Sequence, residues 1–200
     1  PKKAYSEKHK EIKANPLYSK DMENYTDEYL EYIKDLAFAF KTPPHIFVET
    51  RVDYSAFAPE GFGTCDCLLI GGDTLTVVDF KYGRGVPVNA EDNPQMKLYA
   101  LGALEMFSVL YDVSVVSMAV FQPRINNITS TAVFKESIYG WAEEIKPVAQ
   151  TAFEGKGEFK AGEWCRFCKA RHLCRTRTIF ANEPFTESEG KIPPQITAAE

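Results

Sequence analysis

The sequence lacks the marks of a secreted or membrane protein. It has no signal-peptide pattern and no apolar run long enough to cross a bilayer. Its five cysteines are an odd number, which argues against a framework of paired disulfides. No internal repeat is present. These absences predict a cytoplasmic protein without membrane contact.

Positive charge is also scarce. The chain has 23 Lys and Arg against 28 Asp and Glu, and its net charge of −5 argues mildly against nucleic-acid binding. The distribution is uneven, because basic side chains gather between residues 160 and 177, where Trp164 and Phe167 lie among them and Glu163 is the one acid. Such a segment suits phosphate contacts and base stacking, although a solvated basic loop is the alternative. The basic residues are Lys160, Arg166, Lys169, Arg171, Arg175 and Arg177.

The composition fits one domain with extensions at both ends. A chain of 200 residues with 44% hydrophobic and 13% aromatic residues can bury a sizeable core. The Lys-rich start and the polar, Pro-bearing end are unsuited to a core. We expect a loosely ordered N-terminal segment over 1–20, a core domain over 21–158, a Cys-rich basic segment over 159–182 and a flexible tail over 183–200.

Apolar periodicity predicts a mixed α/β core. Helical spacing of apolar residues favours a helix between residues 22 and 40, and β-branched apolar runs separated by turn residues favour strands. In chain order we expect one helix, three strands, a second helix, two further strands and a last helix. The predicted strands are 46–53, 63–70, 75–81, 113–122 and 128–134, and the later helices are 94–109 and 137–153.

Two carboxylates and a lysine are predicted to meet on a β-hairpin. The runs "CDCLLI" and "TLTVVDFKY" flank the turn "GGD", and alternation along a strand places Asp79 and Lys81 on one face. Charged groups in a core strand are costly unless they are paired or bind an ion. Asp66, on the partner strand, adds a second carboxylate, and such oxygen ligands suit Mg²⁺ or Mn²⁺. A solvated surface pair is the alternative for Asp79 and Lys81.

The helix after this hairpin carries polar residues four apart. Asn93 and Pro94 are typical of an N-cap and a first helical residue, so Gln95 and Tyr99 share a face near the positive helix end, which suits phosphate. An ordinary amphipathic helix with a half-buried tyrosine is the alternative. Arg84, between two glycines in the preceding loop, is a further candidate for a phosphate contact.

In this order and spacing, Asp66, Asp79-Phe80-Lys81 and Gln95-x-x-x-Tyr99 resemble the motifs of the PD-(D/E)XK nuclease superfamily, specifically its RecB-like exonuclease branch with the QxxxY motif. Phage- and prophage-associated exonucleases related to the CRISPR adaptation exonucleases are similar. The resemblance covers residues 45–180 and implies a restriction-endonuclease-like αβββαβ core, with a central mixed sheet flanked by helices.

The resemblance also implies residue roles and an activity. Asp66 and Asp79 match metal ligands, joined by the Phe80 carbonyl, Lys81 matches the catalytic lysine, and Gln95 and Tyr99 match DNA contacts. We therefore expect a Mg²⁺- or Mn²⁺-dependent DNA exonuclease, with recombination or phage replication proteins as candidate partners. A non-catalytic nucleic-acid-binding module, or a metal-binding module, on a nuclease fold is the alternative.

The cysteines give a second, independent signal. Cys165, Cys168 and Cys174 form a C-x2-C-x5-C pattern with metal-ligand spacing. The resemblance implies a [4Fe-4S] cluster held by these thiolates and an upstream cysteine that this chain does not supply. His172 could complete a zinc site instead, and three unligated thiols are the other alternative. Cys65 and Cys67, which alternate with Asp66, are predicted to be core residues facing away from it.

The N-terminal region departs from the family pattern. The chain begins at Pro1 without an initiator Met, and no convincing counterpart of the family's upstream histidine ligand is present, since His9 and His45 are weak candidates. We therefore expect a fragment that lacks an upstream part. Glu49 is a weak candidate for an accessory acid, and an edge-strand Glu facing solvent is the alternative.

Overall fold

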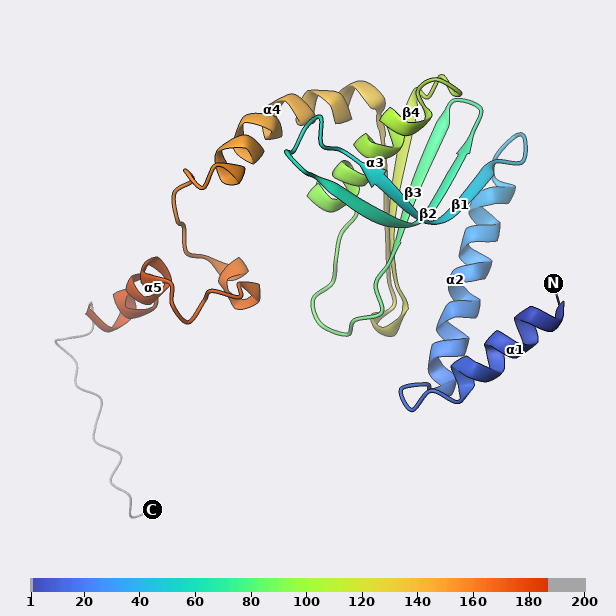
Figure 1. Cartoon of the computed structure of the whole chain (residues 1–200), viewed down its shortest axis with the longest axis horizontal. Helices are drawn as coiled ribbons and strands as arrows, with labels where there is room; N and C mark the ends of the chain where they lie inside the picture. Colours follow the sequence, from blue (N-terminus) through green and yellow to red (C-terminus); the bar gives the residue numbers. More distant parts are fainter. Residues whose placement is uncertain (1, 187–200) are drawn as a thin grey trace, which may run out of the picture. The chain divides into compact units, whose positions relative to one another are not determined.

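The computed structural model describes residues 2–186 (Figure 1). The chain divides into two compact units, residues 1–153 and 154–200. The expected boundary at 158/159 thus lies five residues beyond the structural one. Most of the tail expected over 183–200 lies outside the described residues.

The first unit contains the predicted order of helices and strands. A mixed α/β fold with a central mixed sheet flanked by helices is therefore confirmed, and element ends differ from the predicted ones by a few residues. The elements of this unit are α1 (Lys2–Lys13), α2 (Lys20–Phe38), β1 (His45–Asp53), β2 (Phe62–Gly71), β3 (Thr74–Phe80), α3 (Pro94–Phe107), β4 (Val115–Gln122), a short 3-10 turn (Pro123–Ile125), β5 (Asn127–Phe134) and α4 (Lys135–Phe153).

The five strands form one sheet in chain order, β1-β2-β3-β4-β5. β1, β2 and β3 are antiparallel neighbours, β3 and β4 are parallel, and β4 and β5 are antiparallel. The predicted hairpin turns at Gly72, whose φ of 59° is costly for residues with a Cβ. The parallel pair requires a crossover, and α3 provides it.

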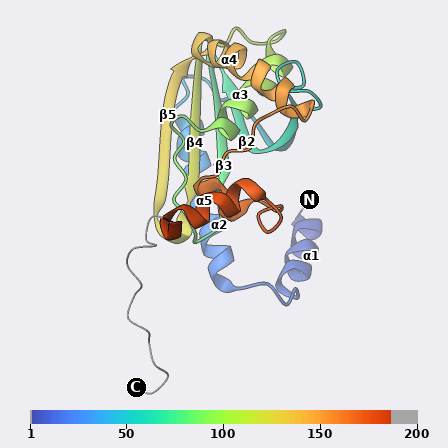
Figure 2. The ribbon, with the colours of Figure 1, turned by 90° about the vertical axis from the view of Figure 1, so that its left-hand side faces the viewer.

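Helices cover both faces of the sheet (Figures 1 and 2). On one face α3 and α4 pack over a core that includes Leu68, Leu75 and Val77. On the other face α2 packs through Ile33 over a smaller core that includes Leu69. Side chains alternate between the faces along a strand, so buried strands with helices on both sides read as continuous apolar runs.

The alternation of side chains between the two faces of the sheet is interrupted at one position of the β1–β2 pair. Cys65 and Leu68 both belong to the core under α3, whereas Cys67 belongs to the core under α2. The strand register does not change across this point, since residue pairs on both sides follow the same offset. Glu49, opposite Asp66 in that offset, has a φ of 50°. A coordinated kink in both strands therefore turns Asp66 out of the regular pleat.

An N-terminal helix is present where the sequence predicted loose order. α1 is joined to α2 at Glu23, whose carboxylate lies 3.0 Å from His9 Nε2 and 3.1 Å from Lys13 Nζ and accepts a hydrogen bond from Tyr18. Lys20 pairs with the same carboxylate. Hydrogen bonds from Lys20, Tyr18 and Lys13 lower the pKa of Glu23 to about 2. His9 therefore lies against the Glu23 carboxylate, at the contact between α1 and α2.

The second unit contains a 3-10 helix (Glu163–Phe167) and α5 (Arg175–Thr186). Within it, Arg171 donates to the Arg166 carbonyl (2.6 Å) and Arg177 to the Arg171 carbonyl (3.4 Å). Two guanidinium groups of the basic segment thus hold its own loops together. Trp164 and Phe167 remain exposed. Across residues 2–186, no helix has the length and apolarity needed to span a membrane.

Candidate active site

Asp79 and Lys81 form the centre of a polar cluster at the end of β3. Asp79 is 3% exposed, and its Oδ2 lies 2.9 Å from Lys81 Nζ. Lys81 follows the strand, and its backbone N–H donates to the Phe121 carbonyl of β4 (2.8 Å). The 2.9 Å contact between the Asp79 and Lys81 side chains confirms the expectation that both lie on one face of the sheet.

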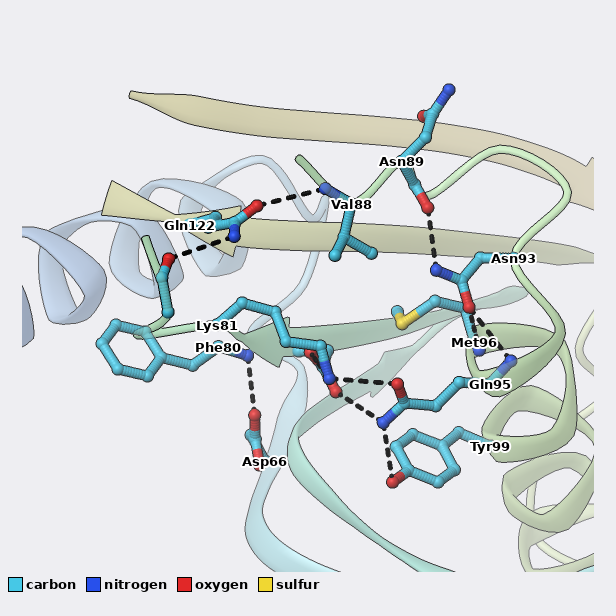
Figure 3. Close-up of polar contacts among 12 residues, drawn as sticks. Asp66, Phe80, Lys81, Val88, Asn89, Asn93, Gln95, Met96, Tyr99 and Gln122 are labelled. Carbon is cyan, nitrogen blue, oxygen red and sulfur yellow. Dashed lines mark hydrogen bonds and ion pairs between the residues drawn. The ribbon is translucent and has the colours of Figure 1, made fainter. Parts of the chain in front are cut away.

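Gln95 and Tyr99 extend the cluster from the first two turns of α3 (Figure 3). Gln95 Oε1 accepts from Lys81 Nζ (3.0 Å), and Gln95 Nε2 donates to Asp79 Oδ1 (3.1 Å) and to the Tyr99 hydroxyl (3.0 Å). Both amide protons of Gln95 are therefore used inside the protein. The expected contact of Gln95 with DNA stays a prediction.

The helix start is fixed as the sequence predicted. Asn93 is the N-cap, and its side chain accepts from the backbone N–H groups of Gln95 (3.0 Å) and Met96 (3.3 Å). Pro94 is the first helical residue. The cap sets the rotation of the first turn and so directs Gln95 and Tyr99 toward Asp79.

Asp66 reaches the cluster through the backbone between Asp79 and Lys81. β2 and β3 pair only as far as Cys67 and Val78, and beyond that rung the strands separate. Asp66 Oδ2 accepts the Phe80 N–H at 2.6 Å, and so takes the place of a strand carbonyl at this fork. Burial raises the pKa of the Asp66 carboxyl; the Phe80 hydrogen bond opposes the shift and the Asp79 charge adds to it.

The side chains of the other predicted ligands and contacts are not part of this hydrogen-bonded group, although Glu49 lies opposite Asp66 in the β1–β2 offset and its charge acts on the Asp66 carboxyl. Phe80, whose carbonyl was predicted as a ligand, directs its ring to the opposite face, 4.9 Å from the Tyr29 ring. Arg84 is exposed on the loop after Lys81. Glu49 is exposed on edge strand β1, in agreement with the alternative of a solvent-facing acid. His45 contacts the hydroxyl of Tyr111.

A buried glutamine that the sequence reasoning missed lies beside this group. Gln122, 3% exposed at the end of β4, binds the backbone of the loop after Lys81. The available signal was a polar residue that closes an otherwise apolar strand just before Pro123. Tyr29 was also missed, because its helical spacing indicated only a core position. Its hydroxyl is buried without a hydrogen-bond partner among residues 2–186, and burial raises its pKa.

The two hairpin cysteines are core residues, as predicted. Cys65 and Cys67 are 0% and 2% exposed, and burial raises the pKa of their thiols to about 12 and about 11. They lie in different core layers, however, so the expectation that both alternate regularly with Asp66 is wrong. The kink at Glu49 and Asp66 is the reason.

The C-terminal cysteines lie in the second unit. Cys168 is exposed, and Cys165 and Cys174 are partly exposed. Gly162 donates its N–H to Cys165 Sγ at 3.4 Å. The neighbouring His172 accepts from Arg171 Nε (3.0 Å), and the cluster and zinc assignments stay predictions.

The donor atoms at the fork meet part of the requirement for a hard cation. Asp79 Oδ2 is buried and accepts no hydrogen bond from residues 2–186, although Lys81 Nζ lies 2.9 Å away. The ammonium is thus close enough for Coulombic attraction but does not satisfy this oxygen with a directed bond. Asp66 adds a partly desolvated carboxylate. Within the described residues no three His, Cys, Asp or Glu side chains are grouped as metal ligands.

Comparisons with known proteins give a family for the whole chain. One solved structure, described as the crystal structure of SSO0001, is 14% identical, with 87% of this chain and 80% of that chain covered and a TM-score of 0.36. A likeness at this level does not bear on the fold or the site. The profile of the family described as "Protein of unknown function (DUF2800)" matches residues 1–200. The chain therefore belongs to the DUF2800 family.

Proposed function

We propose that this protein is a Mg²⁺- or Mn²⁺-dependent deoxyribonuclease that degrades DNA from an end. The observation that carries the proposal is the buried Asp79 carboxylate held against Lys81, with Asp66 at the adjacent fork. A buried carboxylate paired with an ammonium through an oxygen that receives no directed hydrogen bond adds little to folding stability. It is typical of sites where a cation or substrate supplies the missing partner.

The divalent cation would be held by Asp66 and Asp79, with the Phe80 carbonyl as the predicted third protein oxygen. When bound, such a cation supplies charge neutralisation at the scissile phosphate. The fit is partial, because coordination beyond these groups would have to come from water and the phosphate itself. Carboxylate ligands with several waters are the usual Mg²⁺ arrangement.

Lys81 is the proposed catalytic residue. Its ammonium is held in place by Asp79 Oδ2 at 2.9 Å and Gln95 Oε1 at 3.0 Å. Its side chain is 31% exposed, so it retains contact with solvent and can hold or orient a water next to a phosphodiester. Gln95 fixes the direction of both charged groups at once, and Tyr99 fixes Gln95.

DNA would be contacted by groups around the fork that remain accessible. Arg84 is exposed on the loop that follows Lys81, where a guanidinium can pair with a backbone phosphate. The N-terminal turn of α3 adds the positive end of a helix on the same side as Lys81. A role in phage or recombination pathways rests on the sequence resemblance.

A non-catalytic nucleic-acid-binding module is the second candidate. The observation that favours it is the absence of a third grouped ligand among residues 2–186. In that case Asp79 and Lys81 would form a structural ion pair, and the protein would bind DNA equally well with and without a divalent cation.

Digestion of end-labelled and internally labelled linear DNA, with a circular duplex for comparison, tests the proposal. We expect Mn²⁺-dependent release of end label from linear DNA and an intact circle. Asp79→Asn and Lys81→Met should each abolish cleavage, and calorimetry should show Mn²⁺ binding lost in Asp79→Asn but kept in Lys81→Met. DNA binding without any cleavage by the wild type would favour the second candidate.

A further inference from the structure

The side chain of Gln122 makes three hydrogen bonds to the backbone of the loop that follows Lys81. Its Oε1 accepts from the Val88 N–H (3.1 Å), and its Nε2 donates to the carbonyls of Gly83 (3.1 Å) and Val86 (3.2 Å). Asn127 Nδ2 donates to the remaining position on Oε1 (3.0 Å). A single buried carboxamide thus holds both arms of the loop.

The start of β5 fixes the second half of the same loop. Asn127 Nδ2 also donates to the Val88 carbonyl (2.8 Å), and Thr129 Oγ1 accepts the Ala90 N–H (3.0 Å). Asn127 lies directly opposite Gln122 in the β4–β5 pair. The loop is therefore tied to the last rungs of β4 and β5, while its tip around Arg84 stays exposed.

The fixed loop leads directly to the helix cap that orients Gln95. The Asn89 carbonyl accepts from Asn93 Nδ2 (2.8 Å), and Asn93 Oδ1 caps α3 at the Gln95 N–H. Gln95 in turn contacts Lys81 and Asp79. The loop begins at Lys81 and ends at this cap, so its shape sets the spacing between the lysine and the glutamine.

We infer that Gln122 is a positioning residue for this site: by fixing the loop between Lys81 and Asn93, it holds Lys81 and Gln95 in contact. This inference rests on the proposed function, because a positioning role has meaning only if Lys81 takes part in a reaction. The hydrogen bonds that support the inference do not depend on the proposed function, because they are present whether or not the protein is a nuclease.

The energetic reason is the cost of unpaired buried polar groups. Without the buried Gln122 amide, the partly buried Val88 N–H and the carbonyls of the exposed residues Gly83 and Val86 lose the side chain that holds them against the end of β4. The exposed part of the loop would then be free to bind water in place of Gln122, and the Val88 N–H would have to move to find a partner, since a backbone group without a hydrogen bond is disfavoured. Any such movement is transmitted to the Asn93 cap, because the bond from Asn93 to Asn89 belongs to the same segment.

The test compares three variants of the full chain. Gln122→Met keeps the side-chain length but removes all four hydrogen bonds, and Thr129→Val is a milder change that releases only the loop segment at Val88 and Ala90. Val116→Ala is the matched control, because Val116 is fully buried in β4 at the end of the strand away from the loop. It should lower stability without touching the loop.

Two readouts do not depend on activity. Amide hydrogen exchange at Val88 and Ala90 should accelerate about tenfold or more in Gln122→Met. In Thr129→Val, amide hydrogen exchange should accelerate more at Ala90 than at Val88. The side-chain NH₂ resonances of Gln95 should shift or broaden in Gln122→Met. Val116→Ala should leave exchange at Val88 and the Gln95 resonances as in the wild type.

The third readout is catalysis. In Gln122→Met, kcat for Mn²⁺-dependent DNA cleavage should fall about tenfold or more at unchanged Mn²⁺ affinity, because a small displacement of a catalytic group has a large effect on rate. If Gln95 resonances and loop exchange match those of Val116→Ala, or if an active wild type loses no kcat in Gln122→Met, the inference is overturned. Altered resonances with a wild type that cleaves no DNA would support the positioning of Lys81 and reject the nuclease.

Discussion

Tyr99 occupies the space next to Gly63 that any larger residue would need. A Cβ atom at position 63 would lie well inside contact distance of Tyr99 Cε1 and 3.1 Å from Tyr99 Cδ1. Gly63 lies on β2, and Tyr99 lies on α3, where its hydroxyl accepts from Gln95. Because Gly63 has no side chain, the Tyr99 ring can lie against β2 in the position from which its hydroxyl supports Gln95.

Gly63→Ala should displace Tyr99 and loosen the contacts of Gln95 with Asp79. We expect a loss of stability of about 1–3 kcal/mol, which is typical of overpacking, together with weaker DNA cleavage. Gly85→Ala is the matched control, because nothing lies within 4 Å of a Cβ at that position. Urea unfolding and end-label release measure the two effects. Equal behaviour of the two variants would show that the ring adapts without cost.

Tyr99→Phe removes only the hydroxyl that accepts from Gln95 Nε2. The loss of one hydrogen bond should cost about 0.5–1.5 kcal/mol of stability. Because Gln95 then keeps its bonds to Asp79 and Lys81, we expect DNA binding to weaken more than Mn²⁺ binding. Calorimetric titrations with Mn²⁺ and with a short duplex separate the two. A variant that loses Mn²⁺ but keeps its DNA affinity would reverse the assignment of Tyr99.

Asp66→Asn should stabilise the protein at neutral pH. Burial raises the pKa of the Asp66 carboxyl, so the folded state binds a proton more tightly than the unfolded chain. Stability therefore falls as pH rises from the unfolded value of about 3.9 through the raised folded value, and the charge is a constant cost above it. The amide can still accept the Phe80 N–H, so the gain should appear at pH 7 and vanish in acid.

Urea unfolding at a series of pH values measures this effect, with Asp53→Asn as a control of opposite sign. Hydrogen bonds from Ser55 lower the pKa of Asp53, so its stabilising contribution is present above the unfolded pKa and is lost as pH falls. Asp53→Asn should therefore destabilise at pH 7. An Asp66→Asn protein less stable than the wild type at pH 7 would mean that the Phe80 bond requires a charged acceptor.

The cysteines should separate into two reactivity classes. At pH 8 a thiol with a pKa of about 11 has roughly one part in a thousand as thiolate, and Cys65 is raised further, to about 12. Both are also buried, whereas Cys168 is exposed. Iodoacetamide should label Cys165, Cys168 and Cys174 in the native protein and the hairpin pair only after unfolding.

Peptide mass spectrometry over a time course gives the rate for each site. Cys168→Ser should remove the fastest phase and leave the others unchanged. Labelling of Cys65 at the rate of Cys168 under native conditions would contradict the burial of the hairpin.

Local signals in the sequence were sufficient for much of the fold. The turn at Gly72, the cap at Asn93 and the first helical residue Pro94 each depend on short-range preferences, and the structure contains all three. The contact between Asp79 and Lys81 follows from strand alternation together with the burial of β3. These features depend on neighbours in sequence, so a single chain reveals them.

The remaining features depend on tertiary contacts. Regular alternation was assumed along β2, and nothing in the letters "TCDC" marks the kink, which requires the φ of 50° at Glu49 on another strand. The helix α1 looked like a solvated segment, because its ion pairs meet at Glu23, beyond its own end. The role of Gln122 depends on partners more than 30 residues away in the chain.

The kink shared by β1 and β2 makes these two strands evolutionarily interdependent. Deleting one residue near Asp66 would restore a regular pleat in β2 and leave its neighbours in their present core layers, but it would shift the pairing of β2 with β1 beyond that point. A matching deletion near Glu49 would be needed to keep the pair in register. Insertions and deletions at this rung should therefore occur in pairs among relatives, and an unpaired one should mark a protein in which the fork beside Asp79 has been rebuilt or lost.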